Sequence, residues 1–183
     1  MARESMVPVA VPAVPASSLH TATKSYADGL DPVNLVGADA GFIKSSYNVA
    51  QTISTNSDTW VTYTTDDVTH GMATKSALSP GHKWTFNTTG IYTVTGQCRF
   101  AFGSAGGERY YALWSDQSGS DAAISATGYW SNAGTEYTMT ATYTGKFTAG
   151  KYVAGRVWQS SGFNCDLVTF WRWFRIALIR KYV

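Results

Sequence analysis

The sequence has few charged residues and no long apolar run. Charged residues make up 14% of the 183-residue chain, and the formal net charge is +2. A charge so small and so scattered argues against nucleic acid as the main partner. No run approaches the ~20 apolar residues that a membrane-spanning helix needs. The chain starts MARES and then alternates Pro with Val and Ala, where a signal peptide has an unbroken apolar core. We therefore expect neither a nucleic-acid nor a membrane partner.

Residues that support catalysis or bind metals are equally scarce. The histidines lie far apart, and no pair has the spacing of metal ligands: His20, His70 and His82. Asp66, Asp67 and Asp116 could bind a cation in loops, but we favour their interpretation as solvated turn residues. There is no nucleophile elbow, phosphate-binding glycine loop or metalloprotease motif. The sequence therefore predicts a protein that is not an enzyme and holds no cofactor or metal.

The cysteines are Cys98 and Cys165. They could pair in a disulfide, but for a chain made in a cytoplasm we favour reduced thiols in the core. The sequence leaves both possibilities open.

Aromatic residues, in contrast, are abundant. They make up 14% of the chain, and Thr, Ser and Gly dominate the remainder, which is typical of all-β proteins. Two segments, 91–102 and 136–146, alternate apolar and polar side chains as amphipathic strands do. Their apolar positions, which we expect to be buried, include Tyr92, Val94, Phe100, Tyr137, Met139 and Tyr143. From about residue 53, some eight short strands and turns follow at the spacing of a β-sandwich.

The last residues, 166–183, form the most apolar stretch and read DLVTFWRWFRIALIRKYV. Taken as a strand they are apolar on both faces, whereas a half-exposed strand shows a polar side. Such a strand lies in the middle of a sheet, and a second subunit could cover its outer face. A helix is the alternative, but the density of aromatic residues favours a strand. We therefore place a subunit interface at Phe170, Trp171, Trp173, Phe174 and Ile176.

The N-terminal residues differ in composition from the rest. Residues 1–16 contain VPVAVPAVPA, which favours an extended polyproline conformation and has no self-burying pattern. Residues 17–30 predict a cap and a short helix, and residues 33–51 have no clean period, so we interpret them as a linker. We expect an extended arm and linker over residues 1–50 and a globular domain over 51–183. Because a pre-extended arm loses little entropy on docking, we assign attachment to Val7, Val9, Val11, Val14, Leu19 and Tyr26.

A second candidate site lies in the loop near residue 130. Tyr129 and Trp130 are followed by Asn132. An exposed aromatic ring beside an Asn could stack on a sugar, but we favour packing of these rings in the core.

Several short motifs occur in the order and spacing of a known family. Phe86 is followed by Gly90-Ile91-Tyr92 at the start of an alternating strand. Phe147 is followed by Ala149-Gly150-Lys151-Tyr152-Val153, with Lys where an acid is usual. With the Ser160-Ser161-Gly162 loop and a final Ile-Ala-Leu-Ile, these motifs span residues 51–182. This region resembles the trimeric jelly roll of tumour necrosis factor and complement globular heads. The resemblance implies an all-β jelly-roll sandwich that assembles as a homotrimer.

The chain is also similar to structural proteins of tailed bacteriophages, through its Gly-Ile-Tyr motif and its Glu108-Arg109 turn. Residues 23–29, TKSYADG, are similar to a T-K-x-Y-V-D element of phage fibre proteins, with Ala27 in place of Val. The resemblance implies a capsid decoration protein of the head-fibre or cement type, made in the bacterial cytoplasm. It would lie on the virion exterior, with its arm bound to the major capsid protein. The alternative is a tail-fibre or minor tail domain that binds host-surface glycan through the loop at Tyr129, Trp130 and Asn132. A secreted ligand of the cytokine type is a third possibility, and the lack of a signal peptide and disulfide framework argues against it.

Overall fold

The computed structural model describes residues 42–46, 49–68, 71–101, 106–132, 134, 136–169 and 171–182. Strands are the regular elements of this part of the chain. They are, in order, β1 (Phe42–Ser46), β2 (Gln51–Ile53), β3 (Thr59–Trp60), β4 (Thr65–Val68), β5 (Ala73–Leu78), β6 (Gly81–Phe86), β7 (Gly90–Phe100), β8 (Gly107–Ser115), β9 (Ala122–Ser131), β10 (Tyr137–Phe147), β11 (Tyr152–Gln159), β12 (Cys165–Leu167) and β13 (Trp173–Lys181). The expected all-β fold is confirmed. The short helix expected over residues 17–30 lies outside the described residues. Nowhere in the described ranges does a helix have the length and apolarity to cross a membrane.

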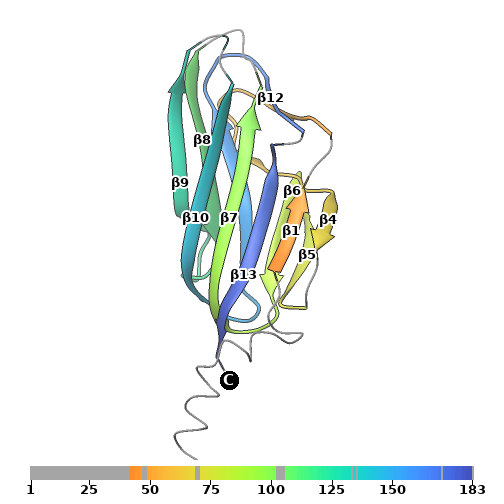
Figure 1. Ribbon diagram of the computed structural model, residues 1–183. Helices are drawn as coiled ribbons and strands as arrows, with labels where there is room; N and C mark the ends of the chain where they lie inside the picture. Colours follow the sequence, from red (N-terminus) through yellow and green to blue (C-terminus); the bar gives the residue numbers. More distant parts are fainter. Residues whose placement is uncertain are drawn as a thin grey trace, which may run out of the picture. The chain divides into compact units, whose positions relative to one another are not determined.

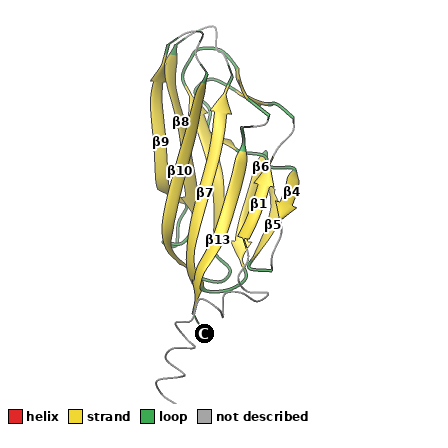
Figure 2. Ribbon diagram, viewed as in Figure 1, coloured by secondary structure: helices red, strands yellow, loops and turns green. Residues whose placement is uncertain are grey.

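The strands form two antiparallel sheets, which enclose one core (Figures 1 and 2). The seven-stranded sheet has the order β2-β12-β7-β13-β1-β4, and β10 pairs with β7. The six-stranded sheet has the order β5-β6-β11-β8-β9, and β3 pairs with β11. In Figure 1, β10, β7, β13 and β1 lie side by side in the front sheet. The result is the expected jelly-roll sandwich.

The longest ladder joins the two segments with the clearest alternation. β7 and β10 pair from Tyr137↔Phe100 to Phe147↔Gly90 without a register shift. Side chains of β7 alternate between buried and half-buried along the whole strand, as a period of two requires. The buried positions expected on these strands are confirmed for Tyr92, Val94, Phe100 and Met139, whereas Tyr137 and Tyr143 are half-buried.

Aromatic pairs join the two sheets across the core. Trp84 on β6 stacks on Phe174 of β13, with ring centroids 4.1 Å apart and ring planes 2° apart. Phe86 on β6 stacks on Phe147 of β10 at 4.3 Å. Such pairs contribute about 0.5–1.5 kcal/mol beyond the burial of their area. The core therefore lies between β6 on one side and β13 and β10 on the other.

The sandwich begins earlier in the chain than expected. Residues 42–46, interpreted from the sequence as part of a linker, form β1, which pairs with β13 and β4. Ile43 is only 2% exposed and belongs to the core. The linker interpretation is wrong for this segment, because one inward-facing apolar residue on a short strand leaves no periodic signal.

The C-terminal run contains two strands instead of one. A loop separates β12 from β13, and in it Arg172 is buried. The guanidinium donates to Gln51 Oε1 at 2.8 Å and to the backbone oxygen of Val49. Buried charged donors need such acceptors, and these draw the chain out of the sheet here. β13 itself lies between β7 and β1 in the middle of the sheet, as the sequence predicts.

Candidate interaction surfaces

The outer side of the seven-stranded sheet carries rows of threonine. In register, Trp173, Arg175 and Ala177 of β13 lie opposite Gln97, Thr95 and Thr93 of β7. The three β7 residues in turn lie opposite Thr140, Thr142 and Thr144 of β10. We call this surface the threonine face; it consists of Thr138, Thr140, Thr142, Thr144, Thr93, Thr95, Gln97, Trp173, Arg175 and Ala177.

Hydrogen bonds across the strands connect the polar groups of this face. The hydroxyl oxygens of Thr93 and Thr144 are 2.8 Å apart, and Thr142 Oγ1 donates to Thr95 Oγ1 at 3.2 Å. Thr140 Oγ1 donates to Gln97 Oε1 at 3.2 Å. Cross-strand pairs of this kind contribute roughly 0.2–1 kcal/mol each. They also bind the hydroxyls within the face, so fewer donors need a new partner when another surface covers it.

Large apolar side chains are exposed at both ends of β13. Trp171 is 49% exposed at the end where the strand begins, and Ile179 is 48% exposed near its other end. The Arg99 guanidinium lies 5.2 Å from the centroid of the Trp171 ring and forms an ion pair with Glu136. The threonine face therefore carries one charged residue, Arg175, which lies in its middle row opposite Lys44 of β1, and has an aromatic residue and an ion pair at one end.

The residues assigned to a subunit interface divide between the two sides of β13. Trp173 is half-buried on the outer side, and Trp171 is exposed. Phe174 and Ile176 have no exposed surface, because they point into the sandwich, so their assignment to an interface is wrong. The run looked two-sided because the outer side of β13 combines Trp173, Ala177 and Ile179. Alternating threonines on residues 138–144 and 93–95 are the sequence signal for this face, but alternation alone indicates only the polar side of a strand.

The rings of the loop near residue 130 are on the surface. Tyr129 is 50% exposed and Trp130 is 74% exposed, and Asn132 is exposed as well. The favoured interpretation, packing in the core, is therefore wrong. Tyr129 stacks on Tyr137 at 5.6 Å, across the edge between β9 and β10. Trp130 follows on β9 with its side chain on the outer side of the six-stranded sheet, opposite Glu108.

Other assigned residues fall outside the described part of the chain. These are the attachment residues Val7, Val9, Val11, Val14, Leu19 and Tyr26, and the interface residue Phe170.

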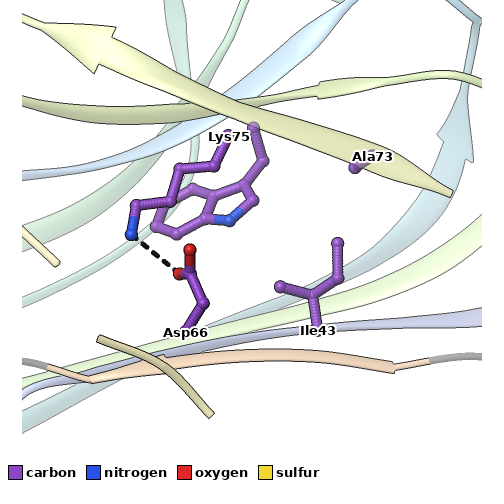
Figure 3. Close-up of a pocket in the computed structure, with 5 residues that line it drawn as sticks. Ile43, Asp66, Ala73 and Lys75 are labelled. Atoms are coloured by element: carbon purple, nitrogen blue, oxygen red, sulfur yellow. Dashed lines mark hydrogen bonds and ion pairs between the residues drawn. The ribbon is translucent and has the colours of Figure 1, made fainter. Parts of the chain in front are cut away.

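One of the aspartates considered for cation binding is engaged with a lysine. Asp66 Oδ1 accepts a hydrogen bond from Lys75 Nζ at 2.7 Å and another from Ser45 Oγ at 2.6 Å. Figure 3 shows Asp66 and Lys75 together at a small pocket beside Ile43 and Ala73. The cavity volume of about 30 Å³ leaves room for roughly one water molecule. Across the described ranges, no group of His, Cys, Asp and Glu could hold a metal ion.

The thiols and hydroxyls of the interior are shielded from solvent. Cys98 and Cys165 are free and buried. Burial raises the pKa of both thiols, so neither has the thiolate character of a reactive cysteine. Tyr63 and Tyr111 are fully buried, with hydroxyl oxygens 3.3 Å apart, and burial raises the pKa of both. These groups stabilise the core and are closed to substrates.

Comparison with known proteins shows the fold. No protein-family model and no curated protein sequence matches the chain. Among solved structures, it is similar to the Eiger TNF from S. frugiperda, with a TM-score of 0.56 and 12% identity over 78% of this chain and 94% of that one. It is also similar to murine APRIL, with a TM-score of 0.60 and 10% identity over 76% of this chain and 99% of that one. The described sandwich therefore has a TNF-like jelly-roll fold, and at these identities the likeness extends to the fold alone.

Proposed function

We propose that the chain is a homotrimeric structural protein whose subunits meet through the threonine face. The observation that carries this proposal is the make-up of that face, which apart from Arg175 is uncharged and has Trp171 and Ile179 exposed at its ends. The centres of protein interfaces are depleted of charge and enriched in aromatic residues. The resemblance of residues 51–182 to trimeric jelly rolls supports the same assembly.

The trimer belongs to a bacteriophage particle, where it decorates the capsid exterior and is not an enzyme. Residues 1–30 bind the major capsid protein, with their prolines holding the chain extended before it docks. The similarity of residues 23–29 to the phage fibre element supports this assignment. Three arms on one trimer raise the effective concentration of each arm at the shell, so detachment is slow.

The mass of the full chain in solution tests the assembly. Light scattering at micromolar concentration should give the mass of a trimer, because an obligate interface buries on the order of 2,000 Å² or more. A soluble, folded monomer at that concentration would contradict the proposal.

Particle binding tests the attachment. The full chain should add to undecorated phage heads, and a chain that starts at Leu35 should still trimerise but leave the heads bare. Equal decoration by both chains would overturn the role of the arm. Binding of the full chain to host cells instead of heads would favour the tail-fibre alternative.

A further inference from the structure

The outer side of the six-stranded sheet carries a second surface, which is rich in aromatic rings. Tyr110 and Trp114 of β8 face outward, and Trp158 of β11 lies opposite Tyr110. Trp60 of β3 lies opposite Arg156, and Trp130 of β9 lies opposite Glu108. We call Trp60, Tyr110, Trp114, Trp130 and Trp158 the aromatic strip. The sheet separates it from the core, so neither the sandwich nor the threonine face uses these rings.

Arg156, which forms an ion pair with Asp58, packs against two of the rings. The Arg156 guanidinium lies 5.2 Å from the Trp60 ring centroid and 4.4 Å from that of Trp114. The two indoles meet edge to face at 6.3 Å. Asp58 Oδ2 fixes the guanidinium from the side at 2.6 Å. Rings held in this way lose little further freedom when a ligand binds.

Small residues border the rings on the side of β9. The outward positions of β9 beside the strip are Ala126 and Gly128, both exposed. Ala112, between Tyr110 and Trp114 on β8, is buried opposite Arg156. The Tyr110 ring lies against Gly128, because a Cβ added to this glycine would be 3.5 Å from Tyr110 Cδ2. The strip is therefore low on this side: four of its rings, Trp60, Tyr110, Trp114 and Trp158, are half-buried, and the Trp130 ring is exposed beside them. A planar ligand can reach the rings from the side of β9.

Charges around the strip balance one another. Arg156 forms an ion pair with Asp58. The Tyr152 hydroxyl donates a hydrogen bond to Asp121 Oδ1 at 2.5 Å, and Lys83 Nζ lies 4.7 Å from the centroid of the Tyr152 ring. Glu108 is exposed beside Trp130. A polyanion needs a surplus of cations along its path, and this surface does not provide one.

We propose that the aromatic strip binds a neutral carbohydrate. A sugar ring has an apolar C–H face, which packs on an aromatic ring, and hydroxyl groups at its edge, which donate to carboxylates such as Glu108. Flat rings with a few polar groups at their border match both sides of such a ligand. The site uses the surface opposite the threonine face, so it serves a monomer and a trimer equally.

Titration of the full chain with neutral hexasaccharides tests the site. Maltohexaose, cellohexaose and chitohexaose serve as probes, with tryptophan fluorescence and saturation-transfer NMR as readouts. At least one of them should bind and should shift tryptophan emission. Trp158→Ala and Tyr110→Ala should each weaken binding about tenfold, the effect of removing one stacked ring. Tyr182→Ala, which removes an exposed ring at the end of the opposite sheet, should bind like the wild type.

A second variant keeps the test decisive if loss of a ring unfolds the chain. Ala126→Arg places a long side chain over the strip from an exposed position and removes nothing from the core, so it should abolish binding at an unchanged melting temperature. Three results would overturn the proposal. They are failure of all three sugars to bind at about 10 mM, tighter and salt-sensitive binding of single-stranded DNA, and a change in assembled mass caused by Ala126→Arg or Trp158→Ala. The last result would identify the strip as a contact between copies of the chain.

Discussion

At the scale of single residues, the interior is packed too closely for even one added methyl group at certain glycines. A Cβ at Gly96 would lie 1.8 Å from Tyr111 Oη, which is itself fixed by the Tyr63 hydroxyl at 3.3 Å. Tyr111 is fully buried, and a close-packed interior leaves a ring little room to shift. The absence of a side chain at Gly96, in the middle of β7, therefore leaves room for the Tyr111 ring from the opposite sheet.

Gly96→Ala should consequently destabilise the fold by about 1–3 kcal/mol, the usual range for overpacking. Chemical denaturation of the two proteins measures the difference. Gly128→Ala is the matched control, since its Cβ would make only an ordinary contact at 3.5 Å. Its effect should stay within about 0.5 kcal/mol. Equal stability of Gly96→Ala and the wild type would contradict the packing described here.

A single histidine links stability to pH. Burial, and next the charge of Lys75, lower the pKa of His82 from its ordinary value of 6.5, against an opposing effect of Asp66. His82 Nδ1 accepts a hydrogen bond from the Tyr63 backbone N–H at 3.1 Å, which requires the neutral ring. On acidification the unfolded chain binds the proton first. The stabilising contribution of His82 is therefore complete above about pH 6.5 and is lost as the pH falls through the folded-state pKa.

His82→Asn should remove this dependence, because the Asn Oδ1 can accept the same hydrogen bond and does not titrate. Denaturation at about pH 7.5 and about pH 5 measures the free energy of unfolding of both proteins. The stability advantage of the wild type should shrink at the lower pH. An advantage that stays constant would show that His82 is not the titrating group.

At the scale of strands, the sequence was informative where one face is buried and the other is not. The alternation of β7 and β10 identified both strands and most of their buried residues, because a period of two has few competing explanations. β1 escaped detection because its five residues contain one clear core position, Ile43. The aromatic strip escaped for another reason. Trp60, Tyr110 and Trp158 are far apart in the chain, and only strand pairing brings them together.

A charge on the outer side of β10 should separate assembly from folding. Thr142 is exposed at the middle of the threonine face, opposite Thr95. Thr142→Lys should leave the sandwich folded, because the side chain points away from the core. It should reduce the trimer to monomers, since an uncompensated buried charge costs several kcal/mol.

The measurement is mass by light scattering, together with the melting temperature of the monomer. Ala126→Lys is the matched control on the opposite sheet and should leave the mass unchanged. A Thr142→Lys protein with the mass of a trimer would move the interface away from the threonine face.

At the scale of the whole molecule, the two sheets present different outer surfaces from one shared core. The seven-stranded sheet shows threonines bonded to one another, and the six-stranded sheet shows aromatic rings around Arg156. A surface with few charges suits a contact between subunits, whereas fixed rings suit stacking of a ligand. The proposed assembly and the proposed ligand site would therefore use opposite sides of the jelly roll.

The place where the chain enters the sandwich decides which truncations fold. A compact unit begins at Leu35, and β1 within it pairs with β13 through Ile43↔Ile176 and with β4. A chain that starts at Leu35 keeps this strand, so it should melt close to the full chain. A chain that starts at Gln51, the boundary expected from the sequence, loses the Ile43 side chain from the core and leaves one edge of β13 unpaired. It should melt at a far lower temperature or aggregate, because loss of a buried Ile alone costs about 2–5 kcal/mol and an apolar edge strand recruits other chains.

Thermal denaturation followed by circular dichroism, with light scattering to detect aggregates, compares the three chains. Similar melting of the Gln51 and Leu35 chains would show that β1 is dispensable, and failure of the Leu35 chain to fold would extend the folding unit into residues 1–34.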